Sequence, residues 1–284
     1  MSLQVKRKFF CKIAEGSLSS QELLASAKKA GCDIYVFDGL EELDYDALLF
    51  ECGFSHVSVQ DNVAKISITT YEDWHRQVCR KWQHDYIAKS RRKGLTVQIV
   101  QPTEQILQDM CEIYNETPVR QDRHFRHYGM TLEQLRKTKD EPLLLIGAFR
   151  NGKLVGFLKL EIQGDVASFA QFLSLVKERD TRVNSALIAK AVEVCVEKKL
   201  LYLVYARMGN HPSLDRFKRS NGFDRFVFRR YYILLTLKGR ILTMLRLHRE
   251  LKSLIPESLK SYLIPAYSWF SRLKAIRSKR VITV

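Results

Sequence analysis

The sequence lacks closely spaced cysteines and any long uncharged apolar run. Its six cysteines are scattered over 284 residues. We therefore expect neither a disulfide framework nor a zinc site, but the reduced thiols of a cytoplasmic protein. The apolar run at 231–237 is cut by Lys238 and Arg240, which argues against a transmembrane helix. Only Phe9 and Phe10 follow the basic residues at 6–8, too little for a signal peptide.

Acidic residues are scarce relative to basic ones. The chain holds 31 Asp and Glu against 47 Lys and Arg, which gives a net charge of +16. The imbalance grows along the chain, because residues 1–70 sum to −3 and residues 238–284 sum to +9. This gradient favours a polyanionic ligand or surface toward the C-terminal end. With 46% hydrophobic residues, the chain can bury a core in one large domain or two small ones.

Between residues 143 and 236 the pattern predicts strands and helices in a definite order. Asn151-Gly152 tolerates the positive φ angles of a type I′ turn, so the apolar runs on either side of it form a hairpin. Ser213 can cap the last helix, and Asn221-Gly222 ends it. The predicted elements are strands at 143–150, 153–162 and 166–176, a helix at about 184–199, a strand at 201–205, a helix from 213, and a strand at 223–236.

This order resembles the GNAT (GCN5-related N-acetyltransferase) superfamily. Asn210 and the segment FKRSNGF at 217–223 carry the resemblance at the end of the fold. The resemblance implies an α/β (α+β) protein with a mixed, mainly antiparallel sheet flanked by helices. It also implies that one strand holds an acyl carrier on one side and an acceptor on the other.

Residues 67–100 carry a second resemblance. Thr70 can cap a helix that begins at Tyr71, has an apolar face and basic residues around it, and ends at Gly94. The segment IAKSRRKGLTV at 87–97 resembles the start of the second half of Fem-type peptidyltransferases, which contain two GNAT-like units and use aminoacyl-tRNA as donor. A solvated basic helix is the alternative. Residues 1–70 are expected to form a small α/β unit that echoes a truncated GNAT-like repeat.

The resemblance implies acetyl-CoA, another acyl-CoA or aminoacyl-tRNA as donor, and no metal. In GNAT enzymes a loop of the form Arg or Gln, x, x, Gly, x, Gly or Ala holds the pyrophosphate of coenzyme A with backbone N–H groups. In the matching stretch, residues 179–184, Arg182 and Asn184 stand where the glycines should be. This departure weakens the prediction of coenzyme A and favours aminoacyl-tRNA. The candidate donor-binding residues are Arg179, Arg182, Asn184, Ser185 and Asn210.

Three residues are candidates for catalysis. Many GNAT enzymes place a tyrosine acid four residues before the glycine that ends the helix, and here that position is Lys218. A lysine could donate a proton or neutralise a developing anion, although an exposed helix charge is the alternative interpretation. Tyr205 is another hydroxyl donor. Glu161 stands on the second hairpin strand, where such enzymes sometimes carry a base, and faces either a cleft or solvent.

Residues 113–129 combine arginine, histidine and tyrosine around Pro118, which interrupts a helix and predicts a shaped loop. Arginine beside aromatic rings suits recognition of carboxylate or phosphate. The predicted acceptor-binding residues are Tyr114, Arg120, Gln121, His127 and Tyr128.

The predicted domains are a small unit at 1–70, a GNAT-like unit at 71–237 and a basic amphipathic helical tail at 238–284. The tail suits an anionic membrane surface, or it packs on the preceding unit. We expect an N-acyltransferase that moves an acyl or aminoacyl group to an amine acceptor, such as an anionic cell-envelope precursor, in the cytoplasm or at the inner face of the membrane. The alternative is a non-catalytic GNAT-like module that binds nucleic acid or an anionic membrane surface.

Overall fold

The computed structural model describes residues 5–11, 25, 29, 31–39, 45–82, 85–120, 123–209 and 211–244. The chain divides into a central unit, residues 60–228, and a second unit made of residues 1–59 and 229–284. This division differs from the expected boundaries at 70/71 and 237/238. Residues 64–67 belong to the central unit because they pair with a strand of that unit, at 202–205.

The central unit is built on a mixed sheet with the strand order β11-β3-β10-β9-β8-β7-β4. Neighbouring strands from β4 to β9 pair antiparallel, as do β3 and β10, whereas β9 and β10 are parallel. The predicted mixed, mainly antiparallel sheet is therefore confirmed. The strand bounds are β3 His56–Ser67, β4 Leu95–Ile99, β7 Leu144–Arg150, β8 Lys153–Gln163, β9 Val166–Ser174, β10 Tyr202–Tyr205 and β11 Asp224–Leu234.

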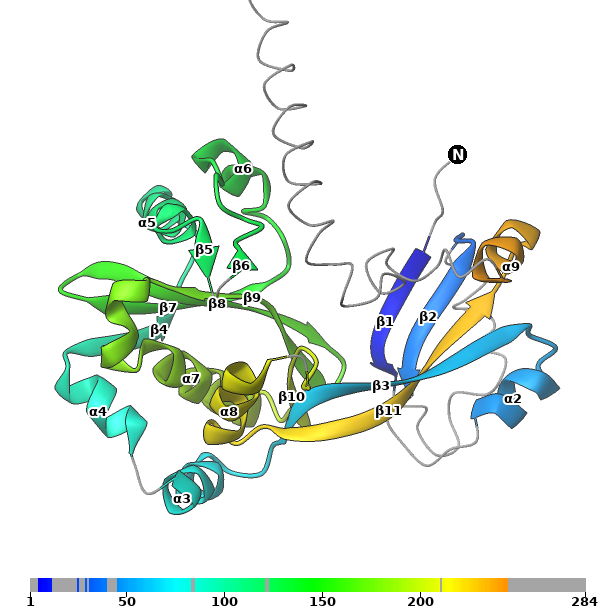
Figure 1. Ribbon diagram of the computed structural model, residues 1–284, viewed down its shortest axis with the longest axis horizontal. Helices are drawn as coiled ribbons and strands as arrows, with labels where there is room; N and C mark the ends of the chain where they lie inside the picture. Colours follow the sequence, from blue (N-terminus) through cyan, green and yellow to red (C-terminus); the bar gives the residue numbers. More distant parts are fainter. Residues whose placement is uncertain are drawn as a thin grey trace, which may run out of the picture. The chain divides into compact units, whose positions relative to one another are not determined.

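Helices cover both faces of this sheet. Helices α5 and α6 lie on one face, and α7 and α8 lie on the other (Figure 1). The apolar band of α7 packs inward, and Leu187 and Ile188 have no exposed surface. A two-stranded ribbon, β5 Val119–Arg120 and β6 Arg123–His124, follows α5. The helix bounds are α3 Tyr71–Trp82, α4 Tyr86–Arg92, α5 Glu104–Asn115, α6 Leu132–Lys137, the 3₁₀ helix η1 Val176–Thr181, α7 Val183–Glu197 and α8 Pro212–Ser220.

Two predicted helix limits need correction. The helix expected from Tyr71 to Gly94 is two helices, because the Asp85 carboxylate accepts hydrogen bonds from the amides of Ile87 and Ala88 and starts a new one. Helix α8 begins at Pro212, with His211 rather than Ser213 at the N-cap. Proline fits the first turn of a helix because its missing N–H would have no partner there.

The predicted stop of α8 at Asn221-Gly222 is confirmed, and a tertiary contact reinforces it. Gly222 has a φ of 86°, in the left-handed region. The indole Nε1 of Trp74 donates a hydrogen bond to the carbonyl of Asn221 at 3.1 Å. A Cβ atom at position 222 would come within 2.6 Å of that Nε1. Glycine is therefore needed here for its conformation and for the close approach of α3.

The second unit contains β1 Val5–Cys11, β2 Ile34–Gly39, α2 Tyr45–Glu51, the end of β11, and α9 Leu237–Met244. Strand β2 pairs parallel with β1 and antiparallel with β11. Phe37 and Tyr231 stack at 5.1 Å between ring centroids, and the edge of Tyr45 packs against Phe37. A truncated GNAT-like repeat stays a prediction for this unit. The basic tail after Met244 lies outside the described residues, and among those described no helix is long and apolar enough to span a bilayer.

Candidate functional site

The parallel strands β9 and β10 separate soon after they meet. They pair from Tyr202 opposite Val166 to Val204 opposite Ser168, whereas β9 continues to Ser174. Next to this point β9 carries a bulge, because Leu160 of β8 faces Phe169, and Lys159 faces Gln171. Bulges are common beside active sites because they bend a strand away from its neighbour. We expected an edge strand near Val176 to align donor and acceptor, but β9, which ends at Ser174, is an interior strand that parts from β10.

Lys218 and Tyr205 meet on one side of this separation. The Lys218 side chain is fully buried, donates a hydrogen bond to the carbonyl of Arg207 at 2.6 Å, and lies 4.5 Å from the centre of the Tyr205 ring. Burial lowers the pKa of Lys218 to about 8, against the opposing effect of Asp215. Burial also raises the pKa of Tyr205 to about 12. The structure thus excludes the solvent-exposed interpretation of Lys218 and supplies an amine that titrates near neutral pH.

Aromatic rings form the surroundings of this pair. Tyr205 stacks on Phe169 at 4.7 Å and meets the edges of Phe172 and Phe223 at 5.6 and 5.9 Å. An apolar enclosure of this kind disfavours the charged form of an amine, which is the cause of the lowered pKa of Lys218.

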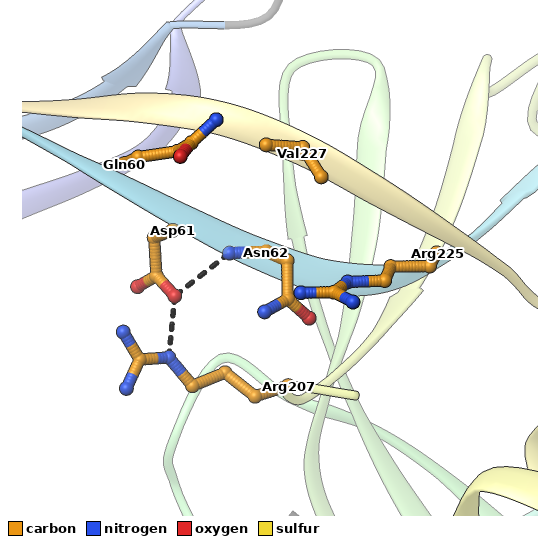
Figure 2. Close-up of a pocket in the computed structure, with 6 residues that line it drawn as sticks. All are labelled: Gln60, Asp61, Asn62, Arg207, Arg225 and Val227. Atoms are coloured by element: carbon orange, nitrogen blue, oxygen red, sulfur yellow. Dashed lines mark hydrogen bonds and ion pairs between the residues drawn. The ribbon is translucent and has the colours of Figure 1, made fainter. Parts of the chain in front are cut away.

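A polar cavity of about 500 Å³ lies beside the same site. Asp61 forms an ion pair with Nε of Arg207 (Figure 2). Asn62 accepts a hydrogen bond from the amide of Met208 at 2.9 Å. Arg207 links cavity and lysine, because its side chain lines the cavity and its carbonyl receives Lys218. The lining residues are Gln60, Asp61, Asn62, Arg207, Arg225 and Val227. Sequence reasoning missed this set, although three consecutive polar residues, Gln60, Asp61 and Asn62, in the middle of β3 were a visible signal.

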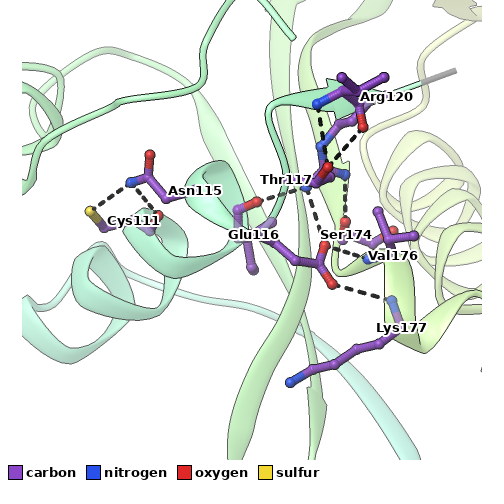
Figure 3. Close-up of polar contacts among 10 residues, drawn as sticks. Cys111, Asn115, Glu116, Thr117, Arg120, Ser174, Val176 and Lys177 are labelled. Atoms are coloured by element: carbon purple, nitrogen blue, oxygen red, sulfur yellow. Dashed lines mark hydrogen bonds and ion pairs between the residues drawn. The ribbon is translucent and has the colours of Figure 1, made fainter. Parts of the chain in front are cut away.

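The loop after β9 is occupied by a side chain of the protein itself. The Glu116 carboxylate accepts hydrogen bonds from the amides of Val176 and Lys177, at 2.5 and 3.2 Å (Figure 3). The amides of Glu178 and Arg182 bond to carbonyls within η1 and its flanks, both at 3.2 Å. These four N–H groups of the loop therefore already have acceptors.

Arg120 holds the end of β9 against α5. Its Nη1 donates to the carbonyl of Ser174 at 2.8 Å, and its Nη2 donates to the carbonyl of Ile113 at 2.7 Å. Glu116 lies 3.5 Å from the same guanidinium. Burial is the main cause that lowers the pKa of Arg120. Together, Glu116 and Arg120 stabilise the loop from the side of α5.

Residues 90–223 match the model of the acetyltransferase (GNAT) family. The chain carries a GNAT domain. Solved structures share its fold. One is FemX, which is 12% identical in sequence with a TM-score of 0.59; the match covers 84% of this chain and 82% of the FemX chain. Another is the C-terminal domain of a candidate lysylphosphatidylglycerol synthetase from Agrobacterium fabrum, which is 12% identical with a TM-score of 0.52; the match covers 86% of this chain and 82% of that domain. No curated protein matches the sequence.

The sheet of the GNAT domain includes a strand from outside the matched segment. Strand β3 ends at Ser67, before residue 90, yet it lies between β11 and β10. Leu203 of β10 faces Ile66 of β3, and both are buried. The matched segment therefore depends on upstream residues to complete its sheet beside the candidate site.

The loop of this GNAT domain departs from the coenzyme A pattern. The Glu116 carboxylate lies on the amides of Val176 and Lys177, just before residues 179–184, and its negative charge disfavours a pyrophosphate nearby. Arg182 has a left-handed φ of 63° and precedes α7 without capping it by its side chain. Of the other predicted donor residues, Ser185 is buried, the Asn184 Oδ1 is buried with no hydrogen-bond partner, and Asn210 lies outside the described residues.

The structure brings two basic segments of the GNAT domain together. The guanidinium of Arg182 lies 4.4 Å from the ring centre of Tyr86, the first residue of α4. Lys93, just after α4, forms an ion pair with Asp180 of η1 at 3.6 Å. Arg179 is exposed on η1. Helix α4, which carries the Fem-like resemblance, thus lies against the loop that was predicted to bind the donor.

Glu161 is not brought together with the other catalytic candidates. It faces Ser168 of β9, which faces Val204 of β10, so these three side chains share one face of the sheet. Tyr205, the next residue, points to the opposite face. Glu161 itself accepts a hydrogen bond from Gln163 at 2.5 Å. The paired part of the sheet therefore separates Glu161 from Lys218.

The predicted acceptor cluster separates into core and surface. Tyr114 is buried and packs against Phe157 and Phe125, at 5.6 and 6.3 Å between ring centroids, and burial raises the pKa of its hydroxyl. His127 lies exposed beside the same rings, and burial and Arg126 lower its pKa. Tyr128 is 46% exposed. Arg120 reaches the end of β9, whereas Gln121 lies outside the described residues.

Proposed function

We propose that this protein is an N-acyltransferase whose acyl group arrives on a polyanionic carrier, an aminoacyl-tRNA, and not on coenzyme A. The observation that carries the proposal is the loop after β9. Glu116 fills its first two amides, and Arg179, Arg182 and α4 surround its outer side with positive charge. A phosphodiester backbone is bound by such surface arginines and lysines.

The chemistry requires one bond exchange and two proton movements. The acceptor nitrogen forms an amide bond with the carbonyl carbon, and the ester bond to the ribose oxygen breaks. The nitrogen loses a proton to water, and the departing oxygen gains one. Lys218, whose pKa is lowered to about 8, is the group we assign to that second step, because an acid is most effective when its pKa lies near the working pH. Holding donor and acceptor together where β9 and β10 part would supply much of the rate.

The cavity beside Arg207 is the proposed acceptor site. Arg225 is exposed at its rim, so an acceptor with a carboxylate or phosphate near its amine would be favoured. The name of the similar Agrobacterium fabrum structure joins a lysyl group to phosphatidylglycerol, an anionic lipid. The reaction proposed here combines the same two chemical classes, an aminoacyl group and an anionic acceptor.

The test is binding of the full chain to an aminoacyl-tRNA with a stable amide linkage, measured by fluorescence anisotropy, and to acetyl-CoA by calorimetry. Changing Arg179 and Arg182 to Ala should weaken RNA binding at least about tenfold, because each charge-assisted contact is worth about 1.5 to 3 kcal/mol. The matched control changes the exposed Lys139 and Lys198 to Ala. Unchanged RNA affinity in the arginine variant, or tight acetyl-CoA binding by the unaltered protein, would contradict the proposal.

A non-catalytic module that binds nucleic acid is the second candidate. It is favoured by the occupied loop and by lysine at the position where many GNAT enzymes carry tyrosine. The two candidates differ in turnover: an enzyme moves a radiolabelled aminoacyl group from tRNA to a small amine, and Lys218→Met slows that transfer. A protein that binds the RNA without transfer, with or without Lys218, is the module.

A further inference from the structure

Three side chains with metal-binding atoms converge where α3 meets α4. His75 and Cys79 stand one turn apart on α3, and Asp85 is the N-cap residue of α4. Nε2 of His75 lies 3.5 Å from Sγ of Cys79 and 3.3 Å from Oδ1 of Asp85. One ligand atom from each residue lies within 4.8 Å of the others.

Hydrogen bonds alone do not explain this arrangement. Nε2 of a neutral histidine carries either a proton or a lone pair. With a proton it can donate to Asp85 but cannot accept the thiol proton of Cys79. With a lone pair it can accept from the thiol but then faces the lone pairs of a carboxylate oxygen. A single Nε2 proton points mainly to one neighbour, and a thiol sulfur is only a weak acceptor. At least one of the two contacts is therefore weak as a hydrogen bond.

The two distances from His75 match the spacing of ligands around a zinc ion. With Zn–N, Zn–S and Zn–O bonds of about 2.0, 2.3 and 2.1 Å at tetrahedral angles, the N–S and N–O edges are about 3.5 and 3.4 Å. The observed separations are 3.5 and 3.3 Å. The amides of Ile87 and Ala88 donate to Oδ1 of Asp85, the oxygen that also contacts His75, and hold the carboxylate in this orientation.

We propose that His75, Cys79 and Asp85 bind one Zn²⁺ ion, with water in the fourth position. The thiolate and the carboxylate together balance the charge of the ion, so the bound site is neutral overall. The side chains of His75 and Asp85 are 30% and 38% exposed, which gives the ion access from solvent. Three protein ligands with one open position make the site exchangeable, unlike a closed four-ligand structural site.

The ion would connect α3 to the N-terminal end of α4. The same α4 carries Lys89, Arg91 and Arg92 and lies against η1 through Tyr86 and Arg182. Bound zinc therefore holds the basic helix in its position beside the loop. This inference stands on the three ligands and does not depend on which donor the protein uses.

The experiment is a titration of the full chain with Co²⁺, followed by the thiolate-to-cobalt charge-transfer absorption, and with Zn²⁺ by native mass spectrometry. One equivalent should bind, and Cys79→Ser should lose the absorption band. The control is Cys111→Ser, which removes another half-buried thiol, one that donates to the carbonyl of Met130. That variant should keep the band.

Asp85→Asn separates the metal from the helix cap. Asparagine caps a helix as well as aspartate does, so α4 and its circular dichroism should be retained. Loss of the anionic ligand should still weaken metal binding by more than about tenfold, the lower end of the loss in affinity that follows mutation of outer-shell partners. The proposal would be overturned if Cys79→Ser and Asp85→Asn bound Co²⁺ with the affinity of the unaltered protein. It would also be overturned if the unaltered protein showed no absorption band at excess Co²⁺.

Discussion

Replacing Lys218 by methionine should remove a pH-dependent part of the stability of the GNAT domain. Methionine keeps an unbranched stem of similar size, so the packing against Tyr205 is largely retained. The carbonyl of Arg207 loses its hydrogen bond, which costs about 1 to 3 kcal/mol at every pH. That constant loss does not affect the pH dependence, which comes from the buried amine.

The magnitude and sign follow from the lowered pKa of Lys218. The pKa falls from 10.5 to about 8, and each unit corresponds to about 1.4 kcal/mol, so about 3 kcal/mol is involved. Above pH 10.5 the amine is neutral in both states. Between about pH 8 and 10.5 the unfolded chain binds a proton that the folded chain does not, so stability falls as the pH is lowered. Below about pH 8 the full penalty is present.

The assay is urea unfolding of the unaltered protein, Lys218→Met and the control Lys198→Met, an exposed lysine, at neutral pH and near pH 10. The free energy of unfolding of the unaltered protein minus that of Lys218→Met should rise by about 2 to 3 kcal/mol across this range. The same difference taken with Lys198→Met should stay near zero. A flat difference for Lys218→Met would show that the amine does not titrate in a buried position, and the assignment of Lys218 as a neutral-pH acid would fail with it.

Two other changes test the loop and the helix end. Glu116→Ala frees the amides of Val176 and Lys177 and should give the protein measurable affinity for inorganic pyrophosphate by calorimetry. Glu116→Gln keeps an acceptor on these amides and should gain less affinity. No gain of affinity in either variant would refute the view that Glu116 closes the loop. Gly222→Ala should lower the thermal midpoint, because its Cβ would strike Trp74 and its φ is positive, at a cost of about 1 to 3 kcal/mol. A midpoint equal to that of the unaltered protein would contradict this reasoning.

Local rules predicted the elements between residues 143 and 236. The turn at Asn151-Gly152 has the positive φ angles that its sequence requires, 51° and 77°. The strands β7 and β8 and the helix α7 begin and end within two residues of their predicted limits. Signals of this kind are read from neighbouring residues, and they survive folding because the tertiary structure uses the same faces. The division of the helix at Asp85 was also local, since a capping side chain there outweighed the continuity of the basic pattern.

What the sequence determined by itself was the order of the elements and the resemblance to the GNAT superfamily, because both depend on residues that are close along the chain. Only the tertiary structure decided which groups meet. It buried Lys218 although its helix pattern allowed exposure, placed Glu161 on the other face, and brought Glu116 onto the loop 60 residues away. It also brought Asp85 to His75 and Cys79, the grouping from which the metal site is proposed. Such contacts depend on strand register and helix packing, which a single sequence does not specify.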